Sequence, residues 1–566
     1  MKIFYQGYGA RGIKPRALAA EPNALVLTKN SWDDYGVKTS FDADLYFDGE
    51  KLDFSFHVKV LIEGSIDTSS TLDFLLAEGW DGRFPIPDKS YVSLPSDIEL
   101  YSILVSKLGK DKAGELLDKL ADAGYLENIL QDGSVSVLIS SSEFSGSLLR
   151  ESGAINAFRD GWKLFYDEDI RIEDFELNVQ TRDNTSVPIP FKFSSRTLPA
   201  DINVLIGPNG IGKSFCIKSL VEYWLRTGMG APDELEQSKH IPFDRAPNFT
   251  KMVLVSYSLF EEFPLDLEDA DDLNDKQAYK YFGFRKRLEG SECIEKDLPK
   301  HQAAESIIKI IYDDYKFDFV EGRVKKLKAV EEAMQRAFSY DDLLLEVPNI
   351  RKLGVLPRVL QERALLEIDG KHYLSLFPEL PNYLDKDKVI EACNLKAGVE
   401  FSYRQQLCQL SSGQYLYTCT AINVVGELRE NCLVVIDEPE LFLHPTLEIE
   451  FISLLKAILE PFKSKAILAT HSLSVVREVP SRCVHIFRHG EFGLDIVPPP
   501  FETFGGDMQR ISTYVFGENS VSKPFEERLE ELVVEHGSRE LIRELRREVN
   551  EEMIMKIMDL GQKYGC

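Results

Sequence analysis

The chain has 566 residues, of which 44% are hydrophobic and 28% are charged, and its formal net charge at pH 7 is −27. This composition excludes a disordered chain, and the length predicts about two to four structural units. The sequence holds no apolar run long enough for a transmembrane helix, and its acidic balance argues against broad, non-specific binding of nucleic acid.

The first predicted unit covers residues 1–165 and mixes strands with helices. Alternating apolar and polar residues predict a hairpin that turns near Asp48-Gly49. Helical periodicity follows in residues 100–130, with Gly109 and Gly124 as breaks. Because no catalytic spacing occurs in this unit, we interpret it as a scaffold or docking surface.

An α/β sheet is predicted from residue 166 onward. Short apolar runs typical of buried parallel strands occur at 202–206, 251–256, 432–436 and 466–469. Residues 166–270 and 400–500 therefore predict two halves of one α/β domain. Between them, residues 271–399 are charged and lack a strong strand signal, which predicts a compact helical insertion. Residues 501–566 predict a helical C-terminal region.

A glycine-rich segment after the first of these strands fits a phosphate-binding loop. The pattern GxxxxGK[ST] is matched by Gly207, Pro208, Asn209, Gly210, Ile211, Gly212, Lys213 and Ser214. In such a loop backbone N–H groups face phosphates, Lys213 would reach the β- and γ-phosphates of ATP, and Ser214 would bind Mg²⁺. A chance glycine loop is the alternative, but the strand before it and the apolar helical pattern after it favour phosphate binding.

Two acidic residues end the apolar run at 432–436. Asp437 suits the coordination of Mg²⁺, and Glu438 can act as a general base toward the attacking water. The alternative is an exposed acidic turn after a buried strand. In a chain that also has a phosphate loop, the catalytic interpretation is favoured.

Two further segments are candidate functional sites because of their order along the chain. A hydroxyl-rich and glycine-containing segment that precedes a predicted helix consists of Ser411, Ser412, Gly413 and Gln414. It can hold an anion at the helix N-terminus, or it can simply cap the helix. His471 ends the run at 466–469, where an imidazole could contact the γ-phosphate, although a lone histidine is more often structural.

In this order, the motifs resemble those of the ABC superfamily. The segment Asp437-Glu-Pro-Glu-Leu-Phe-Leu-His-Pro445 is similar to the branch of SMC-type, RecF-like and overcoming-lysogenization-defect ATPases. The resemblance implies an ABC-type P-loop ATPase head that uses ATP and Mg²⁺ and pairs head to tail with a second head. It also implies that residues 411–414 act in trans on ATP held by the partner, with Glu438 as base and His471 as switch.

The sequence departs from the ABC pattern in two places. Members usually carry a glutamine after the strand that here spans 251–256, but Ser256-Tyr-Ser-Leu-Phe-Glu-Glu262 has none, so its replacement stays open. The long interval between Lys213 and Leu410 shows no sustained heptads of the SMC coiled coil. Segments 32–39, 503–506 and 514–517 look similar to the ATPase subunits of Septu and retron-linked anti-phage systems.

We therefore predict an ATPase that converts ATP to ADP and phosphate as a homodimer or higher oligomer. Its predicted role is to scaffold or restrain a separate effector protein, such as a nuclease, in bacterial anti-phage defence. A DNA-repair or recombination ATPase of RecF/SMC type is the alternative. A transporter nucleotide-binding subunit is less favoured, because the glutamine loop is missing.

The predicted surroundings of the protein follow from composition. No apolar leader follows Met1, and the eight cysteines form no CxxC pair, so we expect a cytoplasmic protein without a membrane partner. Binding of nucleic acid is left open. One candidate contact is the basic cluster of Arg323, Lys325, Lys326 and Lys328, although a solvated helix face is the simpler interpretation.

Overall fold

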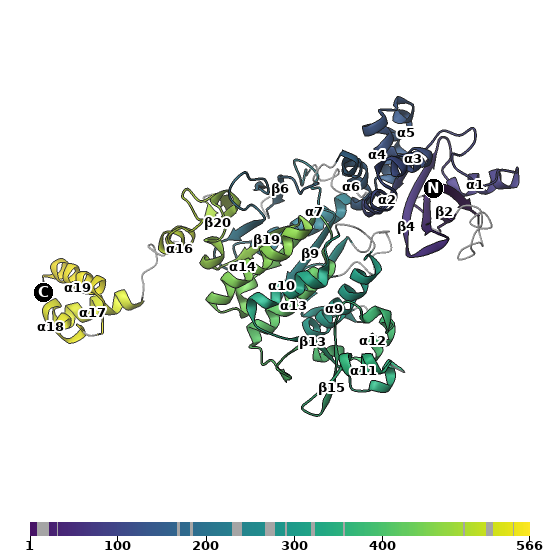
Figure 1. Ribbon diagram of the computed structural model, residues 1–566. Coiled ribbons are helices and arrows are strands. Elements are labelled where there is room, and N and C mark those ends of the chain that lie inside the picture. The colour runs from purple at the N-terminus through teal and green to yellow at the C-terminus, as the bar shows by residue number, and fades with distance from the viewer. Residues whose placement is uncertain are drawn as a thin grey trace. The chain divides into compact units, whose positions relative to one another are not determined.

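The computed structural model describes the chain apart from residues 8–21, 31, 35, 167–169, 182–184, 229–239, 266–277, 289–290, 319–322, 355–356, 491–492, 517–523, 547 and 566. The chain divides into two compact units, Met1–Gly505 and Gly506–Cys566. Along the first unit, an N-terminal sheet precedes a central sheet, into which a smaller sheet is inserted (Figure 1).

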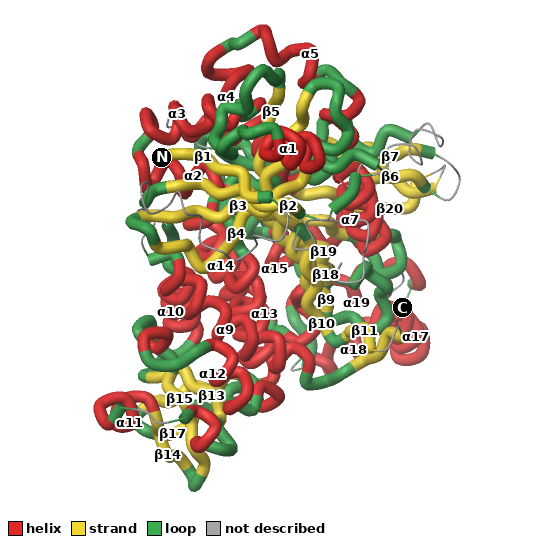
Figure 2. The backbone as a smooth tube through the Cα atoms, turned by 90° about the vertical axis from the view of Figure 1, so that its right-hand side faces the viewer, coloured by secondary structure: helices red, strands yellow, loops and turns green. Residues whose placement is uncertain are grey.

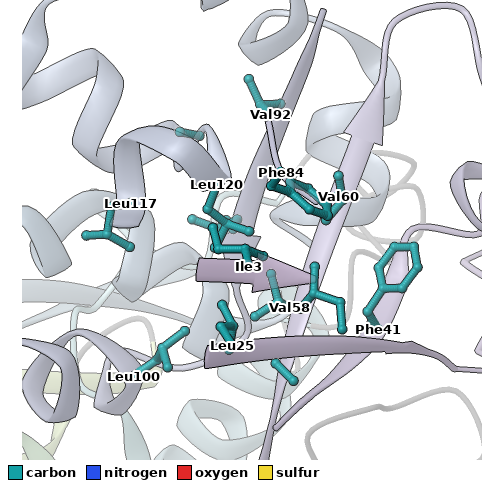
Figure 3. Packing of buried hydrophobic residues seen from close by; sticks show 14 of the residues in the cluster. Ile3, Leu25, Phe41, Val58, Val60, Phe84, Val92, Leu100, Leu117 and Leu120 are labelled. Atoms are coloured by element: carbon teal, nitrogen blue, oxygen red, sulfur yellow. The ribbon is translucent and has the colours of Figure 1, made fainter. Parts of the chain in front are cut away.

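The N-terminal sheet has five strands in sequence order, with β1 and β2 parallel and the other neighbours antiparallel. The strands are β1 (Lys2–Gln6), β2 (Ala24–Lys29), β3 (Ser40–Phe47), β4 (Glu50–Ile62) and β5 (Tyr91–Pro95). The helices are α1 (Thr68–Ala77), α2 (Glu99–Leu108), α3 (Lys110–Leu120), α4 (Ala123–Tyr125), α5 (Ser136–Ile139) and α6 (Ser152–Asp160). Figure 3 shows part of their apolar core, to which Ile3, Leu25, Phe41, Val58, Val60, Phe84, Val92, Leu100, Leu117 and Leu120 contribute.

Local turn chemistry decides the boundaries in this part. The predicted hairpin is confirmed: β3 and β4 are joined by Asp48 and Gly49, whose φ angles of 51° and 81° suit a tight hairpin turn. The break after Leu108 falls at Gly109 as predicted. The break predicted at Gly124 is wrong, because the chain turns at Ala121 (φ 55°) before the Asp122 side chain caps α4, which contains Gly124.

A charged cluster is enclosed in the N-terminal part. Lys59 in β4 is fully buried, and its Nζ lies 3.1 Å from Asp34 Oδ2 and 3.3 Å from Glu151 Oε1. Arg150 Nη1 donates to Asp34 Oδ1 at 2.8 Å, and the Ser147 hydroxyl donates to Asp34 Oδ2 at 2.8 Å. The two cations balance the two carboxylates, which makes their burial tolerable.

The central sheet has seven strands in the order β10-β9-β18-β19-β8-β20-β21, all parallel except β21. These strands are β8 (Ile202–Ile206), β9 (Lys251–Ser256), β10 (Tyr279–Gly283), β18 (Cys432–Asp437), β19 (Lys465–Thr470), β20 (Val484–Gly490) and β21 (Gly493–Val497). The four predicted strands and the α/β fold class are confirmed. Four of the strands, β8, β9, β18 and β19, are buried along almost their whole length, which agrees with the largely apolar residues of their sequences.

Helices cover the central sheet and a hairpin precedes it. Helix α7 (Lys213–Gly228) packs on the sheet through Ile217, Leu220, Val221 and Trp224, which recur at helical spacing. Helix α13 (Ser412–Glu427) packs on α9 (Leu298–Lys316), α10 (Lys326–Ala337) and α14 (Pro445–Leu459), and α14 also packs on α10 (Figure 2). The hairpin β6–β7 (Phe175–Gln180 and Ser186–Phe191) precedes β8 in the chain.

The prediction of a helical insertion at 271–399 is wrong in part. Besides α9, α10, α11 (Arg358–Ala364) and α12 (Lys386–Ala392), this region contributes β10, the hairpin β11–β12 (Arg285–Leu288 and Ser291–Ile294) and most of a five-stranded antiparallel sheet. That sheet has the order β14-β15-β13-β16-β17, formed by Leu365–Ile368, Lys371–Ser375, Asp342–Glu346, Val399–Tyr403 and Gln406–Leu407. Its strands are short, and pairs such as Leu343 with Phe401 join distant segments, so local periodicity does not reveal them.

The candidate basic cluster in this insertion serves the fold. Arg323 Nη1 donates to Glu99 Oε1 at 2.8 Å, which links the insertion to α2. Lys325 pairs with Asp318, and Lys328 lies 3.7 Å from Glu332. Lys326 is buried and donates to the Gly426 carbonyl at 3.0 Å. Because each of the four cations has such a partner, they do not form a shared basic surface.

The second unit is made of helices. They are α16 (Met508–Phe516), α17 (Pro524–His536), α18 (Ser538–Leu545) and α19 (Glu551–Tyr564). Leu529, Val533, Leu541 and Ile557 form the small core that α17, α18 and α19 share. Across the described residues of both units, none of the helices combines the length and apolar character that spanning a membrane requires.

Burial of His485 in β20 predicts an acid-sensitive fold. Its Nε2 lies 3.2 Å from Asn203 Oδ1 in β8, and burial lowers the pKa of the imidazole from 6.5 to about 4. Between these pH values the unfolded chain binds more protons than the folded one, so this residue lowers stability as pH falls from 6.5 to 4. The expected loss is up to roughly 3 kcal/mol.

Urea unfolding at several pH values tests this prediction. His485→Gln keeps a donor for Asn203 and removes the titrating group, so its stability should depend less on pH than that of the wild type in this window. His489→Gln, an exposed change in the same strand, should leave the wild-type dependence in place. Identical acid sensitivity in all three proteins would refute the assignment.

Candidate functional site

The glycine-rich loop between β8 and α7 contains backbone positions that favour glycine. Gly210 and Gly212 have φ angles of 72° and 109°, in the region that side chains disfavour. At Gly207 a Cβ atom would lie 2.4 Å from the Phe487 carbonyl oxygen, because β20 passes close to the loop. Pro208, Asn209 and Ile211 complete the loop, with Asn209 exposed and Ile211 buried in the core beneath it.

Lys213 begins α7 and turns its amine back over the loop. Nζ donates to the carbonyl of Gly207 at 3.0 Å and to that of Pro208 at 3.1 Å. Burial lowers the pKa of Lys213 to about 8, although the carboxylates of Glu438 and Asp437 act against this shift. The amine therefore lies where a phosphate chain held by the loop would need a cation.

Ser214 and Asp437 form a pair of hard oxygen donors at the carboxyl end of the sheet. The Ser214 hydroxyl lies 3.3 Å from each Asp437 carboxylate oxygen. The pKa of Asp437 is raised to about 8, first by burial and then by the negative charges of Glu438 and Glu261. Hydroxyl and carboxylate oxygens are the ligands that Mg²⁺ prefers, and a clustered set of acids favours a divalent cation, so these residues fit that ion.

Glu438 and His471 face each other across neighbouring strand ends. Glu438 Oε1 lies 3.7 Å from His471 Nε2, and the same nitrogen lies 2.9 Å from Lys213 Nζ. Burial, and then the charge of Lys213, lower the pKa of His471 to about 4. At neutral pH the imidazole is therefore uncharged, and its Nε2 can accept a hydrogen bond from the lysine ammonium.

The strand order brings these side chains together. β19, which ends at Thr470, pairs with β8 on one side and with β18 on the other. The histidine that follows β19 is consequently placed between the phosphate loop after β8 and the acidic pair that ends β18.

Residues 411–414 form a helix cap and do not join the cluster around Lys213. Ser411 caps α13: its hydroxyl accepts from the Gln414 N–H at 3.3 Å, and the Gln414 side chain accepts from the Ser411 N–H at 3.0 Å. Ser411 and Ser412 are exposed, whereas Gly413 is buried. Among the described residues, the side-chain hydrogen bonds of this segment run within the cap and not to the phosphate loop.

Two acidic residues near the site were not predicted. Glu261 lies in the segment after β9 where a glutamine was sought, and its charge contributes to the raised pKa of Asp437. Glu440 accepts hydrogen bonds from Thr470 and from the backbone of His471. The acid-rich sequence around each was visible, but only the pairing of β9, β18 and β19 shows that these acids converge.

Comparisons with known proteins support the nucleotide-binding interpretation of this site. Residues 202–477 match the family model of an AAA domain that is described as a candidate AbiEii toxin of a type IV toxin–antitoxin system. The matched stretch includes the glycine-rich loop, the acidic pair Asp437 and Glu438, and His471. Protein ea59 of Escherichia phage lambda is 24% identical over 510 residues, covering 88% of this chain and 87% of that protein.

One solved structure is a distant match. The crystal structure of UvrA2 from Deinococcus radiodurans aligns with a TM-score of 0.22 and 14% identity. The alignment covers 59% of this chain and 38% of the UvrA2 chain.

Proposed function

We propose that this protein hydrolyses ATP at a composite site shared by two copies and thereby controls a separate effector in bacterial anti-phage defence. The observation that carries the ATPase part is the convergence of Lys213, Ser214, Asp437, Glu438 and His471 at one end of the central sheet. The matched P-loop ATPase domain supports it.

The proposed reaction joins a water oxygen to the γ-phosphorus and breaks the bond to the β–γ bridging oxygen, which releases ADP and phosphate. Glu438 takes the proton of the attacking water, and Lys213 turns from the loop carbonyls to phosphate oxygens. His471, uncharged at neutral pH, contacts the γ-phosphate. Ser214 and Asp437 would hold Mg²⁺, and the ion would neutralise phosphate charge there.

The composite character rests on residues 411–414. Ser411 and Ser412 are exposed at the N-terminus of a helix of 16 residues, where hydroxyl and N–H groups suit a phosphate. Their hydrogen bonds remain within the cap, so the segment is available to a second copy. In the proposed dimer the segment of each copy completes the site of the other.

The defence role has its own support. The matched family description names a toxin–antitoxin system, and the phage protein ea59 resembles this chain over most of its length. The toxin–antitoxin description and the phage origin of ea59 are the two observations that favour a role in defence against phages. The N-terminal part and the inserted sheet offer surfaces through which an effector, such as a nuclease, can be held or released.

Loss of nucleotide binding in Lys213→Ala is the first expected result. Removing the buried ammonium should weaken binding of ATP by about 100-fold or more, since several charge-assisted hydrogen bonds are lost. Titration with a fluorescent ATP analogue measures this. Lys218→Ala, a change in the same helix, should bind like the wild type. Equal affinity in all three proteins would contradict a phosphate-binding loop.

The defence role is tested with Lys213→Ala as well. Cells that express the protein with its neighbouring genes should resist phage, and Lys213→Ala should abolish resistance while the co-purified effector stays bound. Full protection by Lys213→Ala would rule the role out. Turnover that depends on DNA, without phage resistance, would favour the repair ATPase instead.

A further inference from the structure

The turn that carries His471 is fastened by a glutamate from the neighbouring strand end. Glu440 Oε1 accepts the backbone N–H of His471 at 2.5 Å, and its Oε2 accepts the Thr470 hydroxyl at 2.8 Å. Both carboxylate oxygens are thus engaged by consecutive residues of one turn. Charge-assisted bonds of this kind are stronger than neutral ones and fix a direction.

A second glutamate holds the other side of the same turn. The Ser472 hydroxyl donates to Glu448 Oε2 at 2.5 Å, from the first turn of α14. Ser472 also caps α15 (Leu473–Val476), where its oxygen accepts from the Val475 N–H at 3.2 Å. The residues on either side of His471 are therefore tied to the segment that follows the acidic pair.

The backbone at Glu438 explains how Glu440 reaches this turn. Glu438 has φ 50° and ψ 58°, a left-handed conformation that costs a non-glycine residue about 1–2 kcal/mol. Its N–H donates to the Ala469 carbonyl at 2.8 Å, so β18 stays paired with β19 up to the reversal. The following 3₁₀ turn, Pro439–Phe442, then directs Glu440 back toward the end of β19. Strained backbone of this kind concentrates at functional sites.

We propose that Glu440 is a positioning residue that sets His471 against Lys213 and Glu438, and that it couples the segment after Glu438 to the histidine turn. The proposal rests on the ATPase function proposed above. Glu440 itself touches neither the phosphate loop nor the proposed base in the structure's hydrogen bonds among described residues; it acts through the backbone of His471. A shift of about 1 Å in a reacting group can cost on the order of 100-fold in rate.

The geometric part is tested without nucleotide by hydrogen–deuterium exchange. In the full-length protein, Glu440→Ala should speed exchange in peptides that contain His471, because the amide loses its acceptor. Glu440→Gln keeps an acceptor oxygen and should remain close to the wild type. Glu430→Ala removes an exposed glutamate at the other end of β18 and should change nothing there. Unchanged exchange in Glu440→Ala would overturn the proposal.

The functional part is tested by a double-mutant cycle on single-turnover ATP hydrolysis. Glu440→Ala should slow turnover by about 10- to 100-fold with ATP affinity within twofold of the wild type, and Glu440→Gln should recover most of the rate. In a His471→Ala background, Glu440→Ala should cost less than about twofold more. A merely structural role predicts losses that multiply, and that outcome would overturn the proposal.

Failure of the two proposals can be told apart. If the wild type and Glu438→Gln hydrolyse ATP equally slowly, the ATPase function fails, while the exchange experiment still reports on Glu440. Should Glu440→Ala not fold, Thr470→Val removes only one of its two partners and should give a smaller effect of the same kind. Exchange and turnover in Thr470→Val that match the wild type would count against the coupling.

Discussion

Replacing Glu438 with glutamine should slow ATP hydrolysis by about 10²- to 10⁴-fold while ATP still binds. The glutamine keeps the size of the side chain and its place 3.7 Å from His471 Nε2, but it cannot accept a proton from water. Binding should persist because Lys213, Ser214 and Asp437 are unchanged. Single-turnover hydrolysis and equilibrium binding of ATP separate the two effects.

The control for this experiment is a glutamate at the opposite end of β18. Glu430→Gln changes an exposed glutamate before β18 and should hydrolyse ATP at the wild-type rate. Turnover in Glu438→Gln within about threefold of the wild type would exclude Glu438 as the base, since general bases contribute far more.

The same variant reports on the composite site. With hydrolysis blocked, ATP should hold two copies together, and sedimentation should detect a dimer that ADP does not support. A Glu438→Gln protein that stays monomeric at high concentration with ATP and Mg²⁺ would contradict the proposal that Ser411 and Ser412 act in trans.

The second large effect concerns stability. Lys59→Met should destabilise the first unit by about 3–5 kcal/mol, because Asp34 and Glu151 lose a buried cation that lies 3.1 and 3.3 Å from them. Met fills a similar volume, so the loss reports on charge and not on a cavity. Urea unfolding measures the change, and faster hydrogen exchange in β4 peptides should locate it.

An exposed lysine in the same part of the chain provides the comparison. Lys89→Met lies in the exposed segment before β5 and should shift stability by no more than about 0.5 kcal/mol. If Lys59→Met proved as stable as Lys89→Met, the buried Lys59 charge would not be needed for stability. Such tolerance is known where a complete buried ion cluster is replaced by apolar residues.

The elements that local sequence determines were predicted correctly. Strands such as Ile202–Ile206 and Cys432–Asp437 are buried on both faces, so their apolar runs stand out. The shape of the glycine-rich loop is equally local, because Gly210 and Gly212 have φ angles that few other residues adopt. Candidate site residues at strand ends could therefore be identified without knowing the order of the strands in the sheet.

What depends on distant pairing could not be predicted. The position of β19 between β8 and β18 follows from contacts between segments far apart in the chain, and it alone explains why His471 meets Lys213. The inserted sheet was missed for the same reason. Glu440 belongs to a motif that was recognised, yet its role depends on a left-handed residue that nothing in the sequence marks.

The contacts of Lys213 imply that its amine would exchange hydrogen-bond partners when a nucleotide binds. Its amine is shared among the carbonyls of Gly207 and Pro208 and the His471 ring. A triphosphate that recruits this amine must release it from the imidazole, whose Nε2 can then carry the ring proton and donate it to the γ-phosphate. Under the proposed function, occupancy of the loop would therefore reach the turn at 470–472 through this one vacated hydrogen bond.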